Sequence, residues 1–153
     1  MGTEVVVELR EITMENFREC IRMEVAERQR GFVASNVYSL AEAKADGVSN
    51  PRAIYAGGTM VGFTMYWFDV EHGTGHIDRL MVGEGQQKRG YGRAAMSEVI
   101  RRLSRMPGCA RILTSFQQDN AVADALYHSL GFRRTGDVDE GETVVALEVP
   151  RSA

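Results

Sequence analysis

A glycine-bearing loop near the middle of the chain has the residue types that bind phosphate groups. It spans residues 87–93, between an expected strand that ends at Val82 and an expected long helix. The first N–H groups of a helix have no partner within the helix, so with the helix dipole they form an anion site. Gly90 and Gly92 would let a diphosphate approach these groups closely. Further loop residues that suit phosphate are Gln87, Lys88, Arg89, Tyr91 and Arg93, three of them cationic.

Two other kinds of phosphate loop fit less well. The G-x-x-x-x-G-K-[ST] pattern of a P-loop does not occur. Residues 90–95 do fit the G-x-G-x-x-A pattern of a dinucleotide site, but that motif begins where its strand ends and needs an acid at the end of the next strand. Here the motif begins well past Val82, and the next strand ends in Phe116-Gln117-Gln118. A loop whose glycines only allow a turn and helix packing remains the alternative.

The strand before this loop carries candidates for proton transfer. Alternation along the strand places on one face His76, Asp78, Leu80 and Val82. Asp78 could accept a proton from a substrate, directly or through water, and His76 is the second candidate for a base. A salt bridge between Asp78 and a neighbouring arginine such as Arg79 is the alternative. His72 and His76 have no third ligand at a fixed spacing, so we expect no metal site.

Tyr127 is the candidate for a general acid. It lies in an expected helix whose inner face is formed by Val122, Ala125, Leu126 and Leu130. Because Tyr127 falls off the centre of this stripe, its hydroxyl could face a cleft and give a proton to a leaving group. The alternative is a tyrosine of the hydrophobic core.

The hydrophobic periodicity predicts a mixed α/β domain with seven strands and four helices. The strands are expected over residues 4–9, 52–56, 60–70, 76–82, 111–116, 132–138 and 143–149. Thr13 can cap the first helix, and a capping box at residues 39–42 predicts a second helix over residues 40–45. The third helix follows Gly92 and buries Met96, Val99, Ile100 and Leu103, and the fourth is capped by Asp119 or Asn120.

Composition limits the class of protein. The 153 residues suit one domain over 1–153, and 44% hydrophobic with 25% charged residues is ordinary for a globular protein. A net charge of −3 argues against a nucleic-acid partner, and no apolar run approaches the ~20 residues that span a bilayer. Residues 1–10 do not have the pattern of a secretory signal, so we expect a cytoplasmic protein. Cys20 and Cys109 alone form neither a disulfide framework nor a zinc site.

Taken together, these motifs resemble those of the GNAT superfamily of N-acetyltransferases. Gln87, Gly90 and Gly92 fit the family's [QR]-x-x-G-x-[GA] motif, and residues 80–82 fit the L-x-V that precedes it. Asn120 and Tyr127 match an asparagine and a tyrosine that follow the next strand. The order of elements agrees over nearly the whole chain. In a narrower match, residues 32–41 resemble bacterial spermine/spermidine (diamine) acetyltransferases.

The resemblance implies a fold, a cosubstrate and roles for the residues above. The fold would be a splayed seven-stranded mixed sheet with about four helices, and the cosubstrate acetyl-coenzyme A. Its pantetheine arm would lie along Leu80, Met81 and Val82, its diphosphate on residues 87–93, and Asn120 would hold the arm from the other side. Tyr127 would be the general acid, and the N–H of Met81 or Val82 would polarise the acetyl carbonyl.

The acceptor is then a small-molecule amine, with a polyamine or diamine expected first. Substrate-binding candidates are Glu27, Phe32, Asn36 and Asp78, with further acids at Glu24, Asp69 and Glu71. A homodimer is expected, as is common in the family. The alternatives are acetylation of another amine, such as an amino acid, an aminoglycoside or a protein N-terminus, and a non-catalytic module that binds acyl-coenzyme A.

Overall fold

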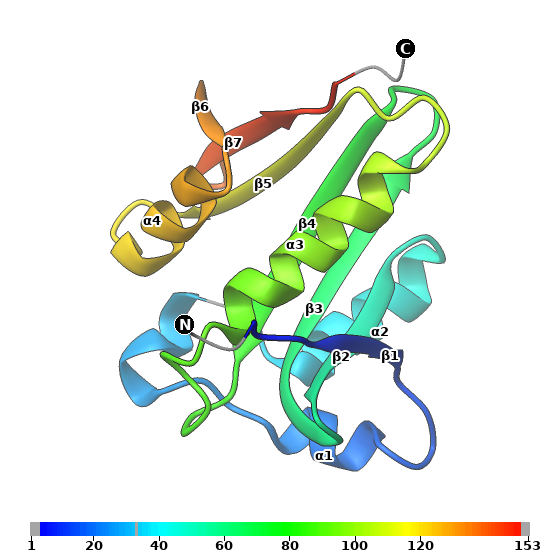
Figure 1. Cartoon of the computed structure of the whole chain (residues 1–153), viewed down its shortest axis with the longest axis vertical. Helices are drawn as coiled ribbons and strands as arrows, with labels where there is room; N and C mark the ends of the chain where they lie inside the picture. The colour runs from blue at the N-terminus through cyan, green and yellow to red at the C-terminus, as the bar shows by residue number, and fades with distance from the viewer. Residues whose placement is uncertain (1–3, 33, 151–153) are drawn as a thin grey trace.

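A seven-stranded mixed sheet with helices on both faces forms the molecule (Figure 1). The computed structural model describes residues 4–32 and 34–150, and the strand order is β1-β2-β3-β4-β5-β7-β6. The strands are β1 (Glu8–Glu11), β2 (Asn50–Ala56), β3 (Thr59–Asp69), β4 (Thr74–Val82), β5 (Arg111–Gln117), β6 (Arg133–Asp139) and β7 (Glu142–Glu148). The helices are α1 (Phe17–Arg22), α2 (Asn36–Asp46), α3 (Tyr91–Ser104) and α4 (Ala121–Ser129), with a 3-10 helix η1 (Glu27–Phe32). The expected fold class, strand number and helix number are therefore confirmed.

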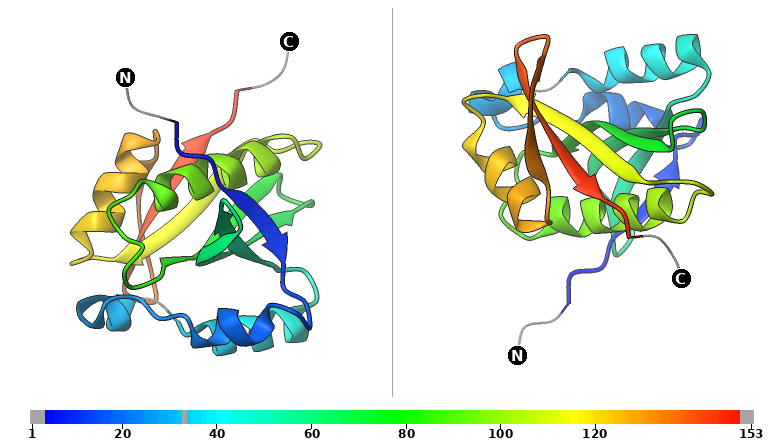
Figure 2. Two further views of the ribbon diagram at one scale, coloured as in Figure 1. Left: turned by 60° about the horizontal axis from the view of Figure 1, so that its bottom comes forward. Right: turned by 90° about the horizontal axis from the view of Figure 1, so that it is seen from above.

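Helices cover both faces of the sheet (Figure 2), and each face has its own hydrophobic core. The stripe predicted for α3 is buried on one face, where Met96, Val99 and Leu103 contact the sheet and α4. On the opposite face, α1 and α2 contribute Cys20 and Ala43 to a second core. The two layers of helices pack on the sheet from both sides, and the site lies at its central strands.

The centre of the sheet is split. β4 pairs with β5 in parallel from Thr74 to Ile77, opposite Arg111 to Thr114, and within the described residues this pairing ends there. Beyond that point the two strands diverge, as Figure 1 shows. The part of β4 nearest the glycine loop therefore pairs with β3 along one edge, while its other edge faces a gap instead of β5.

A β-bulge in β4 corrects the expected alternation of side chains. Met65 of β3 pairs with Arg79, whereas the next residue, Tyr66, pairs with Ile77, so Asp78 is the extra residue. Leu80 and Ile77 pack in the core beneath α3, while the ring of His76 turns to the other face and stacks on Trp67 with centroids 4.3 Å apart. The prediction that residues 76, 78, 80 and 82 share one face is therefore wrong, because the bulge shifts the alternation.

Two local predictions about helices are also wrong. The second helix begins at Asn36 rather than at residue 40, because the side chain of Ser35 accepts from the N–H of Tyr38 at 3.1 Å and so caps it. In α4, Val122 is 68% exposed and Ala125 is exposed, and the inner face is instead Ala123, Leu126, Tyr127 and Leu130. This second stripe has the same helical spacing and shares Leu126 and Leu130 with the expected one. The first strand is shorter than expected and begins later in the sequence, since it spans Glu8–Glu11 instead of residues 4–9.

Candidate active site

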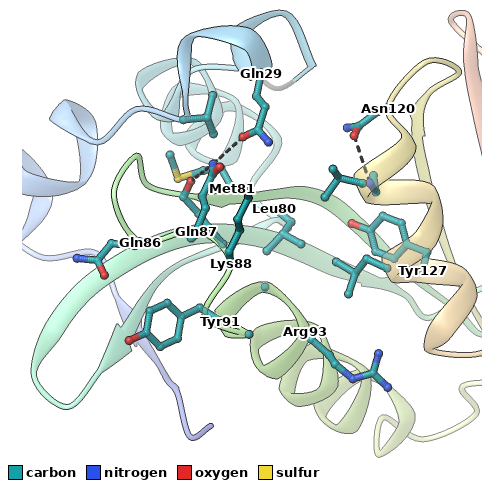
Figure 3. Close-up of a pocket in the computed structure, with 17 residues that line it drawn as sticks. Gln29, Leu80, Met81, Gln86, Gln87, Lys88, Tyr91, Arg93, Asn120 and Tyr127 are labelled. Atoms are coloured by element: carbon teal, nitrogen blue, oxygen red, sulfur yellow. Dashed lines mark hydrogen bonds between the residues drawn. The ribbon is translucent and has the colours of Figure 1, made fainter.

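A cavity of about 360 Å³ opens where β4 and β5 diverge, between the start of α3 and α4 (Figure 3). We call it the loop cavity. Every residue that the sequence assigned to the cosubstrate lines it except Arg89, which is exposed outside it. Those lining residues are Leu80, Met81, Val82, Gln87, Lys88, Gly90, Tyr91, Gly92, Arg93, Asn120 and Tyr127. The fold therefore brings together segments that are far apart in the sequence.

Glycine is favoured at Gly90 and at Gly92 for different structural reasons. Gly90 is the N-cap of α3 with φ +84°, a left-handed conformation that a side chain strains, and a Cβ there would lie 3.3 Å from Val5. Gly92 has no such constraint. A Cβ at Gly92 would lie 3.6 Å from Val82 and 3.9 Å from Leu126, which are both walls of the loop cavity. Gly90 thus shapes the loop, and Gly92 keeps the cavity open beside the first N–H groups of α3.

Side-chain hydrogen bonds hold the rim of this cavity. The amide of Gln87 donates to the carbonyl of Val82 at 3.0 Å and to Oε1 of Gln29 in η1 at 2.6 Å. Arg93 donates to the hydroxyl of Ser129, which joins α3 to the end of α4. Asn120 caps α4 by accepting from the N–H of Ala123 at 3.2 Å. The rim is therefore built before any ligand arrives.

A second cavity, of about 430 Å³, adjoins the loop cavity and is lined by four carboxylates. These belong to Asp78, Asp139, Glu140 and Glu142, and we call this space the acidic cavity. The two cavities share the side chains of Leu80, Asn120, Ala123 and Tyr127. A ligand in one cavity would therefore meet a ligand in the other at these residues.

Tyr127 stands at this junction. Its ring is 5% exposed and packs against Phe116 and Phe132, with centroids 6.1 and 5.4 Å away. Burial raises the pKa of Tyr127 to about 12, so the hydroxyl keeps its proton at neutral pH. The structure makes Tyr127 both a core residue and a wall of the two cavities, so the two interpretations of the sequence are compatible.

Asp78 faces the acidic cavity and is not the ion-pair partner of Arg79. The guanidinium of Arg79 instead donates to Ser39 at 3.2 Å and to Glu42 at 3.0 Å, both in α2. Although the side chain of Asp78 is open to the cavity, the surrounding protein removes enough water to raise its pKa to about 6, against the opposing effect of Arg79. A carboxylate with this pKa is ionised at neutral pH and is a stronger base than an ordinary aspartate.

Several predicted site residues do not reach either cavity. His76 lines neither one, and burial lowers its pKa. Asn36 is 4% exposed and donates to the carbonyl of Cys20 at 2.8 Å, so it joins α2 to α1 within the core and lines neither cavity. Glu27 is exposed and lines neither cavity, and the side chain of Phe32 lies outside the part of the chain that the structure describes.

Glu24 and Asp69, which the sequence analysis expected around an acceptor, also line neither cavity. Glu24 pairs with Arg30, and Asp69 with His72. Besides Asp78, the acids that line the acidic cavity lie in the β6–β7 hairpin, and the sequence analysis missed them. The only available signal was the run of acids at residues 137–142, but its place beside the site depends on the pairing of β5 with β7.

The described residues contain neither a cluster of metal-ligating side chains nor a helix that could span a membrane. No three His, Cys, Asp or Glu side chains among them gather as a metal site. None of the described helices is both long and apolar enough to cross a bilayer.

Comparison with known proteins agrees with the fold. The sequence model of the acetyltransferase (GNAT) family matches residues 6–132. The chain therefore belongs to this family, and it is an N-acetyltransferase. It is 28% identical over 150 residues to a spermine/spermidine N(1)-acetyltransferase of Bacillus subtilis, covering 94% of this chain and 99% of the relative.

Solved structures share the fold at lower identity. A spermidine N-acetyltransferase of Vibrio cholerae, in complex with CoA and spermine, matches with a TM-score of 0.75 at 13% identity, covering 94% of this chain and 95% of that one. A ribosomal L7/L12 α-N-protein acetyltransferase in complex with coenzyme A matches with a TM-score of 0.76, also at 13% identity, covering 97% of each chain. Because proteins named for such different acceptors match equally well, the fold by itself does not select the acceptor.

The raised pKa of Asp78 predicts a pH-dependent stability difference. An acid whose pKa is higher in the folded state than in the unfolded state destabilises the fold once it ionises, because the unfolded chain loses the proton more easily. Asp78→Asn is therefore expected to raise the melting temperature at pH 7–8, and the gain should shrink as the pH falls from about 6 toward the ordinary value of 3.8. Thermal unfolding followed by circular dichroism between pH 4 and 8 measures it. A gain that is the same at every pH would contradict the raised pKa.

Proposed function

We propose that this enzyme moves the acetyl group of acetyl-coenzyme A to a primary amine of a polyamine or diamine such as spermidine or spermine. The observation that carries the proposal is the meeting of the two cavities at Tyr127, one walled by the glycine loop and the other by four carboxylates. The names of the Bacillus subtilis relative and of the Vibrio cholerae structure support the same acceptor class.

The residues of the loop cavity fit coenzyme A. A diphosphate would lie against the first N–H groups of α3, beside the open space at Gly92 and the cation of Lys88. The edge of β4 from Leu80 to Val82 faces the gap in the sheet, so its backbone groups can bond a pantetheine arm as a neighbouring strand would. The bound cosubstrate supplies an acetyl group activated as a thioester.

Asp78 and Tyr127 are proposed to move the protons. In forming the N–C bond and breaking the C–S bond, the ammonium group of the substrate gives up two protons. One leaves to solvent through the carboxylate of Asp78, directly or through water, before the nitrogen attacks. The hydroxyl of Tyr127 gives its proton to the departing sulfur, and the second proton of the nitrogen then restores the Tyr127 hydroxyl. The N–H of Met81 or Val82 is the proposed donor to the acetyl oxygen. His76 remains a candidate for a base, but Asp78 is better placed because it lines the acidic cavity.

The three acids of the β6–β7 hairpin are proposed to hold the remaining cations of the acceptor. Asp139, Glu140 and Glu142 line the same cavity as Asp78, and Glu142 also accepts from the hydroxyl of Ser115 at 2.8 Å. A polyamine would place its reacting nitrogen beside Tyr127 and its other ammonium groups beside these carboxylates. A homodimer is a further proposal, which follows from the family resemblance.

Neutralising the hairpin acids tests the acceptor class. The double variant Asp139→Asn/Glu140→Gln is expected to raise the KM for spermidine about tenfold, since each lost charge pair is worth up to ~1 kcal/mol. The KM for a monoamine of similar length should change less than twofold. Release of free thiol, measured over a panel of polyamines, monoamines, amino acids, aminoglycosides and N-terminal peptides, provides both values. Efficient turnover of another class, with none for polyamines, would overturn the proposed acceptor.

A charge at Gly92 tests the place of the diphosphate. Gly92→Asp should weaken coenzyme A binding at least tenfold, because its carboxylate would enter the space left for phosphate, while an acid in the first turn of α3 does not harm the helix. Gly92→Ala is the matched control, since its Cβ makes ordinary contacts of 3.6–4.0 Å. Isothermal titration calorimetry and melting temperatures measure affinity and folding separately. Unchanged affinity in the folded Gly92→Asp protein would exclude this placement.

A further inference from the structure

A short segment crosses the split in the sheet and borders both cavities. We call residues 24–31 the strap; it includes most of η1. Val25 and Gln29 line the loop cavity, whereas Gly31 lines the acidic cavity. The strap therefore runs past the region where the thioester and the amine would meet.

The strap has little hydrophobic anchorage of its own. Among its described side chains only Val25 is buried. A 3-10 helix also has poorer hydrogen-bond geometry than an α-helix. A segment with these properties opens easily unless polar contacts from the rest of the protein hold it.

Both sides of the split supply such contacts, and each supplies a glutamine. On the β4 side, Gln87 donates to Gln29 at 2.6 Å, and the N–H of Glu84 donates to the carbonyl of Glu24 at 2.7 Å. Figure 3 shows Gln29 and Gln87 facing each other above the loop cavity. On the β5 side, Gln117 is the last residue of its strand and donates to the carbonyl of Gly31 at 2.7 Å.

We propose that Gln29 and Gln117 are positioning residues that clamp the strap across the split sheet. The clamp at Gly31 fixes the wall of the acidic cavity, so it sets how tightly the amine is held. The clamp at Gln29 joins the strap to a residue of the glycine loop, so it links the two cavities. With both clamps closed, the strap limits the access of water to the thioester. This inference rests on the proposed amine acetylation for its kinetic consequences, but the clamping itself does not.

Two substitutions test whether Gln117 holds the strap in place or only lines the acidic cavity. Gln117→Leu and Gln117→Glu both remove the amide donor, and they differ in charge. A lost clamp should raise the KM for spermidine about fivefold in both variants, the effect of about one hydrogen bond, with less than a twofold change in the KM for acetyl-coenzyme A. If Gln117 only contributed polarity to the cavity, the added negative charge of Gln117→Glu would instead lower the KM for a polycation.

Two further measurements report on the opening of the strap. Amide hydrogen exchange over residues 24–31 should become faster in both Gln117 variants and in Gln29→Leu, in protein without any ligand. Thiol release from acetyl-coenzyme A in the absence of amine should also rise at least twofold, because water reaches the thioester. Gln118→Leu is the matched control: Gln118 lines neither cavity, and its side chain donates a hydrogen bond to the carbonyl of Gly141 at 3.4 Å.

The outcomes distinguish the clamp from the proposed function. Faster exchange confined to the strap, with the melting temperature unchanged and Gln118→Leu like wild type, supports the clamp even if no amine is acetylated. Exchange as slow as in wild type in all three clamp variants would overturn the clamp, whatever the acceptor. A lowered KM for spermidine in Gln117→Glu would also overturn it. Failure of the wild-type protein to acetylate any amine would overturn the proposed function alone.

Discussion

The separation of β4 from β5 after Ile77 and Thr114 is the constraint on which the rest of the site depends. Paired backbone groups in the middle of a sheet normally satisfy each other, so a split there needs another partner for them. At the fork itself, the hydroxyl of Thr114 donates to the carbonyl of Ile77 at 2.9 Å and so ends the ladder. Immediately beyond it, the bulge at Asp78 bends β4. A cavity between the two strands follows, with a row of backbone groups along one wall.

Removal of surrounding water acts in the same direction on Asp78 and Tyr127, the two residues proposed to transfer protons, but with different results. It raises the pKa of Asp78 to about 6 and that of Tyr127 to about 12. At neutral pH the carboxylate is still ionised and has become a better proton acceptor, while the phenol keeps the proton that it is proposed to donate. One physical cause, the removal of water at the fork, therefore supports both the proposed base in the acidic cavity and the proposed acid at the junction of the two cavities.

Local patterns in the sequence predicted the glycine loop, α3 and the order of elements, because these features are set within a few residues of each other. The loop cavity follows from that order, since the end of β4, the start of α3 and α4 must meet. Features set by distant pairing were not predictable. The bulge that turns His76 away from Leu80 depends on β3, and the acids at 139–142 reach the site only because β7 pairs with β5. In α4 two stripes of equal periodicity were available, and only the packing of Tyr127 against Phe116 and Phe132 selects one.

A crystal structure of the protein with coenzyme A and spermidine tests the central claim most directly. The account predicts the pantetheine arm between β4 and β5, the diphosphate on the N–H groups that open α3, and the sulfur within hydrogen-bond reach of the Tyr127 hydroxyl. The amine should lie in the acidic cavity, with one nitrogen beside Asp78. Coenzyme A bound elsewhere on the protein, with the gap between the strands filled by solvent, would contradict it.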